Sequence, residues 1–240
     1  MSFSPAAVVI PTFNEAANIA RLIPQLLELN VELLVVDDSS TDGTPEIVSE
    51  FAKQSERVRL LSRPGKMGLG SAYREGFARL LKGDYQVIIQ MDADGSHRVA
   101  DLRRMMKFQQ DHPECDVVIG SRWTAGGAVE NWPKKRELLS RLANLYSRVI
   151  LGLKVRDNTA GFRIYRSELL KRIKLSEVTS EGYAFQIEMT RAATRAGANI
   201  AEVPILFIER ESGVSKMSGK IIREALIKVT KWGLLRIIGR

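Results

Sequence analysis

Asp92 and Asp94 lie one residue apart and directly follow the mostly apolar run 87–91, which is typical of a strand that ends in a tight turn. Two carboxylates at this spacing can direct oxygens at one hard cation. Mg²⁺ and Mn²⁺ prefer oxygen ligands and commonly bridge one or two carboxylates to substrate phosphates. Aspartate is also frequent in plain polar turns, because its side chain bonds to the nearby backbone. The pair therefore indicates either a metal–diphosphate site or a structural turn.

Other polar residues also follow apolar runs. Asp37 and Asp38 come directly after the run 33–36, and Arg122 follows the run 117–120. The carboxyl ends of parallel strands meet at one edge of a sheet, and open α/β sheets bind ligands there. If these runs are parallel strands, one edge gathers carboxylates and an arginine. This placement favours the metal–diphosphate interpretation of the acidic turn.

Apolar runs alternate with helical patterns through the first half of the chain. We expect strands over residues 7–10, 33–36, 58–61, 87–91 and 117–120, and helices over 19–27, 44–54, 70–81 and 101–110. This alternation predicts an α/β fold with a mostly parallel, Rossmann-like central sheet flanked by helices. The second half is less regular: we expect a loop over 122–135, helices over 136–151 and 184–196, a short strand over 161–165 and extended chain over 200–208.

Composition restricts the class of protein. A chain of 240 residues fits one domain, and 45% hydrophobic with 27% charged residues is ordinary for a globular protein. Cys115 is the single cysteine, so no internal disulfide can form. The N-terminus lacks a secretory pattern, and no stretch approaches the ~20 apolar residues of a spanning helix. We therefore expect a cytoplasmic protein without a membrane span.

The net charge of +8 favours a negatively charged partner, such as nucleic acid, anionic lipid or a phosphorylated substrate. Aromatic residues are sparse among the basic ones, and no helix-turn-helix, zinc or RNA-binding signature occurs. We therefore expect no nucleic-acid partner. A nonenzymatic nucleotide-binding protein stays open, because a fold does not fix a function.

Three ordered segments carry a family resemblance: 9–15 (VIPTFNE), 36–44 (VDDSSTDGT) and 92–97 (DADGSH). Together they resemble family-2 glycosyltransferases of the GT-A fold. Further segments are similar in order and spacing to the polyprenol-phosphate (dolichol-phosphate) mannose synthases: 120–122 (GSR), 129–133 (VENWP), Arg136, 161–163 (GFR) and 213–216 (GVSK). The resemblance extends to about Ser218. It implies a GT-A domain over residues 1–218, followed by a basic amphipathic helix over 219–240.

The resemblance implies a nucleotide-sugar site at the strand ends. Pro11, Phe13 and Glu15 match the segment that binds the base and ribose, and Val36 with Asp38 matches the residues that recognise the nucleoside. The family usually has tyrosine where this chain has Phe13, so stacking is retained while a phenolic hydrogen bond is lost.

The acidic turn matches the donor and metal site of the family. Asp92, Ala93 and Asp94 match its donor-binding residues, and the two aspartates match its ligands to Mg²⁺ or Mn²⁺. Ser96 stands where the subgroup commonly has a glutamine that contacts the metal, so we expect its hydroxyl as a further ligand. We expect a packing or supporting role for His97.

Four basic residues match the phosphate-binding cations of the subgroup: Arg122, Arg136, Arg210 and Lys216. The resemblance assigns Arg210 and Lys216, with Arg122, to the donor. It assigns Arg122 and Arg136, with Ser140, to the acceptor phosphate.

Asp94, Arg122 and Arg136 are the residues to which we assign catalytic roles. Arg163 is a lesser candidate for phosphate binding.

The implied reaction is transfer of mannose from GDP-mannose to a polyprenyl monophosphate. Such an acceptor needs no general base, because the second pKa of a phosphate monoester is ~6 and the phosphate arrives largely ionised. A single displacement would invert the anomeric centre. Transfer of glucose or another sugar to a lipid phosphate, and transfer to a sugar hydroxyl, remain alternatives.

The C-terminal segment is amphipathic and basic. One helical face carries apolar residues at Ile221, Ile222, Ala225, Leu226, Val229 and Trp232, while lysines and arginines lie elsewhere. This pattern predicts either binding to a membrane surface or docking on the protein core. The apolar segment 137–153 is a second candidate for lipid contact. We expect a peripheral protein on the inner face of a membrane.

Overall fold

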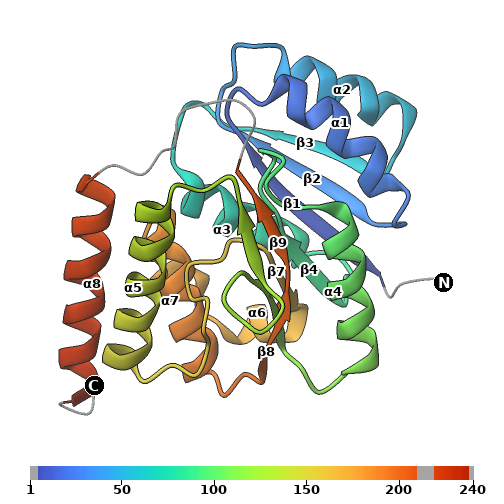
Figure 1. Cartoon of the computed structure of the whole chain (residues 1–240). Helices are drawn as coiled ribbons and strands as arrows, with labels where there is room; N and C mark the ends of the chain where they lie inside the picture. Colours follow the sequence, from blue (N-terminus) through green and yellow to red (C-terminus); the bar gives the residue numbers. More distant parts are fainter. Residues whose placement is uncertain (1–4, 210–218, 238–240) are drawn as a thin grey trace.

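The computed structural model describes residues 5–209 and 219–237, and Figure 1 shows their arrangement. Its strands are β1 (Ala6–Thr12), β2 (Glu32–Asp37), β3 (Val58–Ser62), β4 (Val87–Gln90), β5 (Val117–Ser121), β6 (Ala128–Glu130), β7 (Arg163–Arg166), β8 (Ile200–Pro204) and β9 (Leu206–Ile208). Seven of them form one sheet in the order β3-β2-β1-β4-β7-β5-β8, and β6 pairs with β9 in a second sheet. The predicted α/β fold is confirmed.

Helices cover both faces of the large sheet. One hydrophobic core lies beneath α1 (Ala16–Leu27), α2 (Thr44–Gln54) and α4 (Val99–Asp111). The other lies beneath α3 (Leu69–Leu80), α6 (Ser167–Arg172) and α7 (Gly182–Arg195), with the short 3-10 helix η1 (Leu175–Glu177) beside them. Alternate β1 residues enter the two cores, Val8 and Ile10 on one face and Ala7 and Val9 on the other. Burial on both faces explains the continuous apolar runs.

Six of the seven strands of the large sheet run in one direction, and β7 runs antiparallel to both of its neighbours, β4 and β5. Its sequence, RIYR, was predicted as a strand without a direction. The expected loop over 122–135 contains β6, which pairs with β9. Both differences arise from pairing with strands far away in the sequence, which a local pattern does not reveal.

Helix α3 approaches the sheet closely at Gly76. A Cβ at this position would lie 2.4 Å from Val9 Cγ1 on β1, so no larger side chain fits without movement. The close approach brings the first turns of α3 near the carboxyl ends of β1 and β4.

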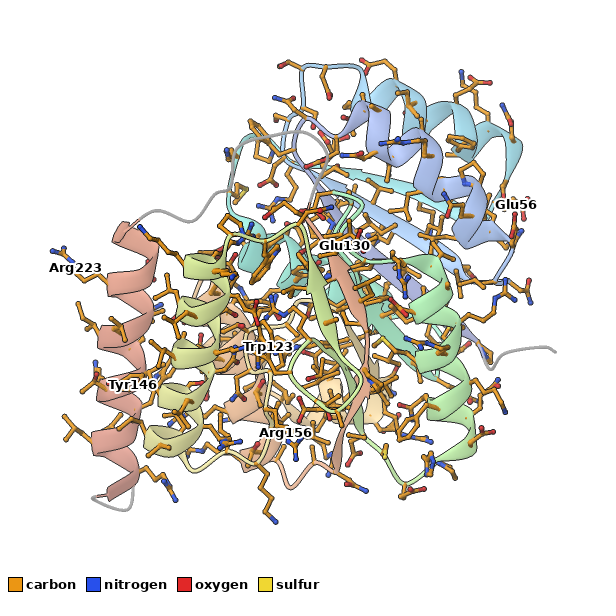
Figure 2. The ribbon with its side chains drawn as sticks, in the orientation of Figure 1. Glu56, Trp123, Glu130, Tyr146, Arg156 and Arg223 are labelled. Carbon is orange, nitrogen blue, oxygen red and sulfur yellow. The ribbon has the colours of Figure 1, made fainter. Side chains whose placement is uncertain are left out.

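Two further helices lie outside α7, namely α5 (Lys134–Leu151) and α8 (Gly219–Ile237). Figure 1 shows α8 at the outer edge of the molecule beside α5. Val229 of α8 is buried in a small apolar cluster with Leu151, Leu153 and Ile187. The hydroxyls of Tyr146 and Thr230 are 2.7 Å apart, and Figure 2 shows Tyr146 at this boundary.

Docking of α8 on the core is therefore observed, as one of the two predicted alternatives. Membrane binding by its outer face stays a prediction. Within residues 5–209 and 219–237, no helix combines the length and the apolar character that crossing a membrane requires.

Candidate active site

A cavity of about 340 Å³ opens at the carboxyl ends of β1, β2, β4 and β5. Sequence-predicted residues that line it are Pro11, Phe13, Glu15, Asp38, Asp92, Ala93, Asp94, Arg122 and Arg136. These residues lie together at one edge of the sheet, as predicted from their positions after the strands. Val36 and Ser96 do not line this cavity, and Ser140 lines a neighbouring one. Arg210 and Lys216 lie outside the described residues, so their assignments stay predictions.

Both carboxylates of the acidic turn are fixed by hydrogen bonds. The hydroxyl of Tyr73, on α3, donates to Asp92 Oδ1 at 2.5 Å. Burial, reinforced by the charge of Asp92, raises the pKa of Tyr73 well above its ordinary value, so the phenol remains a donor. Asp94 Oδ1 accepts bonds from Ser96 N at 3.1 Å and from Ser96 Oγ at 2.5 Å.

His97 lies beneath the turn as a packing residue. Its ring stacks on Phe162 with a centroid distance of 4.6 Å, and its Nδ1 accepts the backbone N–H of Asp92 at 3.1 Å. Burial lowers the pKa of His97, which favours the neutral ring. Because Nδ1 accepts, the proton of the neutral ring is on Nε2.

The donor set of the turn fits a cation that is shared with a substrate. Asp92 and Asp94 line one cavity, and the described part of the chain contains no cluster of three or more His, Cys, Asp or Glu placed to bind a metal. A hard cation with two carboxylate ligands completes its shell with water and substrate phosphates. Ser96 is buried and donates to Asp94, so it fixes that carboxylate; direct coordination by its hydroxyl stays a prediction.

Asp38 anchors the loop that precedes α3. Its Oδ1 forms a buried ion pair with Arg63 Nε at 2.8 Å, and its Oδ2 accepts the N–H groups of Met67 and Gly68 at 3.0 and 3.2 Å. The carboxylate at the edge of the cavity is therefore fixed in place. Its predicted contact with the nucleoside stays a prediction.

Phe13 contributes an aromatic face at the same end of the cavity. Lys66 Nζ lies 4.0 Å from the centroid of its ring, a cation–π arrangement.

Glu15 is fixed through its backbone N–H, which donates to Thr44 Oγ1 at 3.0 Å. Thr44 is the first residue of α2, and Gly43, with a φ of +91°, is the N-cap. The side chain of Val36 is fully buried in the core, so only its backbone can approach a ligand.

Glu181 is a lining residue that the sequence did not reveal. Its carboxylate accepts the N–H groups of Gly70 at 2.7 Å and Ser71 at 3.0 Å, and it pairs with Arg74 at 3.1 Å. These N–H groups belong to the first turn of α3, where backbone donors lack partners within the helix and favour negative charge. Glu181 therefore fixes the start of α3 from a position 111 residues beyond Gly70.

Arg122 makes a buried bidentate pair with Asp157, which the sequence also did not reveal. Nε donates to Oδ2 at 2.8 Å and Nη2 to Oδ1 at 2.7 Å, and Nη2 also donates to Thr159 Oγ1 at 2.7 Å. Burial acts to lower the pKa of Arg122, but the charge and hydrogen bonds of Asp157 outweigh burial and raise the pKa. Arg122 Nη1 makes no hydrogen bond within the described ranges and is available to a ligand.

Arg136 lies in the first turn of α5, beside an aromatic ring. It pairs with Glu209, and its guanidinium carbon lies 4.1 Å from the centroid of the Trp132 ring. Arg163, in contrast, is fully buried and donates to the carbonyl oxygens of Asn158 and Ala160. It stabilises the loop before β7 and does not line the cavity.

A second cavity of about 530 Å³ adjoins the first and is mostly apolar. Side chains of α5, α7 and α8 line it: Leu139, Leu142, Ala143, Leu145, Tyr146, Val149, Ile187, Ala225, Leu226 and Val229. Arg122, Trp132, Thr159 and Tyr183 line both cavities. A pocket lined by five acidic residues, Asp92 and Asp94 among them, is therefore continuous with an apolar groove, and an arginine lies where they meet.

Comparison with known proteins agrees with this architecture. The model of the family described as Glycosyl transferase family 2 matches residues 7–174. A polyprenol monophosphomannose synthase from Mycolicibacterium smegmatis is 47% identical over 230 residues, which cover 95% of this chain and 86% of that protein. An undecaprenyl-phosphate mannosyltransferase from Micrococcus luteus is 44% identical over 228 residues, which cover 94% and 93%.

Solved structures of low sequence identity share the fold. Glucosyl-3-phosphoglycerate synthase from Mycobacterium tuberculosis, in complex with Mn²⁺, UDP-glucose and phosphoglyceric acid, gives a TM-score of 0.72 at 19% identity, covering 96% of this chain and 80% of that one. A mannosyltransferase from Pyrobaculum calidifontis, in complex with GDP-Man and Mn²⁺, gives 0.60 at 19% identity, covering 100% and 66%. The family model and the curated relatives together confirm the predicted membership: this chain belongs to glycosyltransferase family 2 and is a glycosyltransferase of the GT-A fold.

Proposed function

We propose that this enzyme transfers mannose from GDP-mannose to a polyprenyl monophosphate, with inversion at the anomeric carbon. One observation carries the proposal: the polar cavity of the acidic turn continues into an apolar groove, and Arg122 lines both. A lipid phosphate has this combination of an anionic head and an apolar chain. The curated relatives named for polyprenol monophosphomannose synthesis and for undecaprenyl-phosphate mannosyl transfer support the same acceptor and sugar.

The donor binds along the strand ends. Phe13 offers its ring to the base, and the acidic turn faces the diphosphate. Asp92 and Asp94 would bind Mg²⁺ or Mn²⁺ there, and such a cation supplies charge neutralisation for the leaving diphosphate. The hydrogen bonds from Tyr73 and Ser96 keep the carboxylates in position before substrate arrives.

The acceptor phosphate binds where the cavities meet. Arg122 and Arg136 line the first cavity and Ser140 lines the second, so a phosphate at the junction is within the reach of cations and a hydroxyl. The phosphate is already ionised near neutral pH and attacks without a general base. Its attack on the anomeric carbon expels the nucleoside diphosphate from the opposite side, which inverts the configuration.

The first test is the reaction itself. With a polyprenyl phosphate and Mg²⁺ or Mn²⁺, we expect β-mannosyl phosphate product from GDP-mannose, little from UDP-glucose, and none with EDTA. Asp94→Asn should lower kcat/KM about 10²-fold or more, because a charged group at the diphosphate is lost. Asp84→Asn, at an exposed site outside the cavity, is the matched control. Product with retained configuration, or preference for UDP-glucose, would contradict the proposal.

The buried ion pair of Arg122 and Asp157 predicts that one substitution weakens both the stability of the fold and the binding of the acceptor. Asp157→Asn leaves Arg122 buried without its counter-charge, which should cost about 3–5 kcal/mol in the free energy of unfolding. It should also raise KM for the lipid phosphate more than KM for GDP-mannose. Urea denaturation and steady-state kinetics measure the two effects, with the exposed Glu50→Gln as control. Equal changes in both KM values would argue against an acceptor role for Arg122.

The apolar groove predicts a dependence on lipid chain length. Ala143→Trp fills the groove and should raise KM for a long polyprenyl phosphate about tenfold, while a short prenyl phosphate and GDP-mannose are affected much less. Leu138→Trp is the control, because Leu138 lies on the same helix, is 59% exposed and does not line the groove. The same KM increase for short and long acceptors would place the lipid elsewhere.

The outer faces of α5 and α8 support peripheral membrane binding. Leu138, Ile227 and Leu234 are exposed there, and the groove-lining Leu142, Leu145, Val149 and Leu226 are also exposed. Exposed basic residues lie on the same helices, and Figure 2 shows Arg223 extending away from the molecule. Apolar and basic side chains together favour the surface of an anionic bilayer.

The paired substitutions Ile227→Glu and Leu234→Glu should weaken sedimentation with anionic vesicles and leave GDP-mannose binding unchanged. Removal of the whole helix would also expose Ile187 and Leu151, so point variants are the sharper test. The exposed Ala100→Glu on α4 controls for added charge. Vesicle binding equal to that of the unmodified protein would refute membrane contact through α8.

A further inference from the structure

Two buried glutamine side chains lie beside the acidic turn, and the reaction described above does not use them. Gln90 ends β4, two residues before Asp92, and is fully buried. Its Nε2 donates to Gln186 Oε1, on α7, at 2.8 Å. Gln186 is 3% exposed and nevertheless lines the first cavity. Gln90 therefore fixes the orientation of the Gln186 amide.

The amide nitrogen of Gln186 is directed toward the cavity near Gly161. A Cβ built on Gly161 would lie 3.5 Å from Gln186 Nε2 and 3.3 Å from Asp92 Oδ2. These two polar atoms thus flank a point where the chain has no side chain. Gln186 Nε2 makes no hydrogen bond to residues 5–209 or 219–237, although the side chain is almost completely buried. Gln186 Nε2 is therefore not shut off from solvent but is accessible from the cavity, where it can donate to a ligand or to water.

The chemistry of the two groups identifies what binds there. A carboxylate oxygen accepts and an amide N–H donates, and a sugar hydroxyl is the group that both donates and accepts. The oxygens of an ionised diphosphate only accept hydrogen bonds, so they have no proton to donate to Asp92 Oδ2. The aromatic ring of Phe13 lies after β1 rather than beside β7. The position beside Gly161 therefore suits the hexose of the donor rather than its diphosphate or base.

We propose that Gln186 is a specificity residue of the donor site: with Asp92 it binds one hydroxyl of the hexose, and Gln90 is its positioning residue. The inference rests on the proposed function, because it assumes a nucleotide-sugar in the first cavity. It adds a contact by which the enzyme distinguishes one hexose from another. A site with fixed polar groups discriminates strongly against a substrate that lacks the matching hydroxyl.

The test compares GDP-mannose with four analogues that each lack one hydroxyl, at C2, C3, C4 or C6. In the unmodified enzyme, removal of the bound hydroxyl should lower kcat/KM about tenfold or more. In Gln186→Leu, kcat/KM for GDP-mannose should fall about 5- to 10-fold, and the loss caused by that one deoxy position should largely disappear. The effects of the other three deoxy positions should stay as they are.

Two further variants separate recognition from structure. Gln90→Leu combined with Gln186→Leu removes both amides, so no buried group is left without a partner, and should show the same loss of discrimination. Gln109→Leu removes another buried glutamine, 5% exposed and outside the cavity, and should leave the deoxy series unchanged. Binding of GDP by calorimetry should be equal in all variants.

The proposal is overturned if Gln186→Leu lowers kcat/KM by the same factor for GDP-mannose and for every analogue, since that pattern indicates a purely structural role. It is also overturned if the variant changes nothing. Failure of the proposed function looks different, because the unmodified enzyme would then not use GDP-mannose at all. In that case the same deoxy series is made for the hexose that the enzyme transfers.

Discussion

The buried ion pair between Arg122 and Asp157 is the interaction on which the two-cavity site depends. Burying both charges is expensive, and only a bidentate geometry with additional hydrogen bonds compensates for it. Asp157 in turn is fixed from below, because its N–H and that of Arg156 donate to the carboxylate of Glu202 on β8. The pair therefore joins the end of β5, the loop before β7 and strand β8 into one rigid unit at the junction of the cavities.

Around this unit the molecule separates two environments. The first cavity is lined by carboxylates and by the strand ends of the sheet, and the second is lined by apolar side chains of α5 and α8. Helix α8 contributes in two ways. Its inner face closes the groove through Ala225 and Val229, and Lys228 donates to Ser180 at 3.0 Å, next to the Glu181 that fixes α3. The helix is thus connected to both cavities.

The sequence was sufficient to predict the parts of the fold that depend on local pattern. Strands buried on both faces appear as continuous apolar runs, so most strand ends, and with them the acidic turn, were located correctly. The direction of β7 was not predicted, because RIYR satisfies either direction and only its neighbours decide. The apolar face of α8 fitted a membrane surface and a protein core equally well. Only the tertiary structure shows that α5 and α7 present an apolar surface on which this face docks.

The unpredicted site residues share one property: each acts on a partner far away in the sequence. Glu181 binds Gly70 across 111 residues, Gln186 binds Gln90 across 96, and Asp157 binds Arg122 across 35. None of these residues belongs to a motif at the place where it occurs. Residues that directly follow a predicted strand can be placed at the site from the sequence. Asp157, Glu181 and Gln186 lie in the second half of the chain and do not follow such a strand, so only the tertiary structure places them.

Helix α3 has a consequence for the tolerated length of the chain. At one end of the site, Asp38 binds its N-cap, Gly68, and Glu181 binds its first turn, whereas Tyr73, a few residues later, binds Asp92 at the other end. At 1.5 Å per residue, the five steps from Gly68 to Tyr73 correspond to about 7.5 Å along the axis. This short segment sets the separation between the Asp38 end and the Asp92 end of the cavity. Surface loops can gain or lose residues freely, but an insertion here would shift the register of one end against the other.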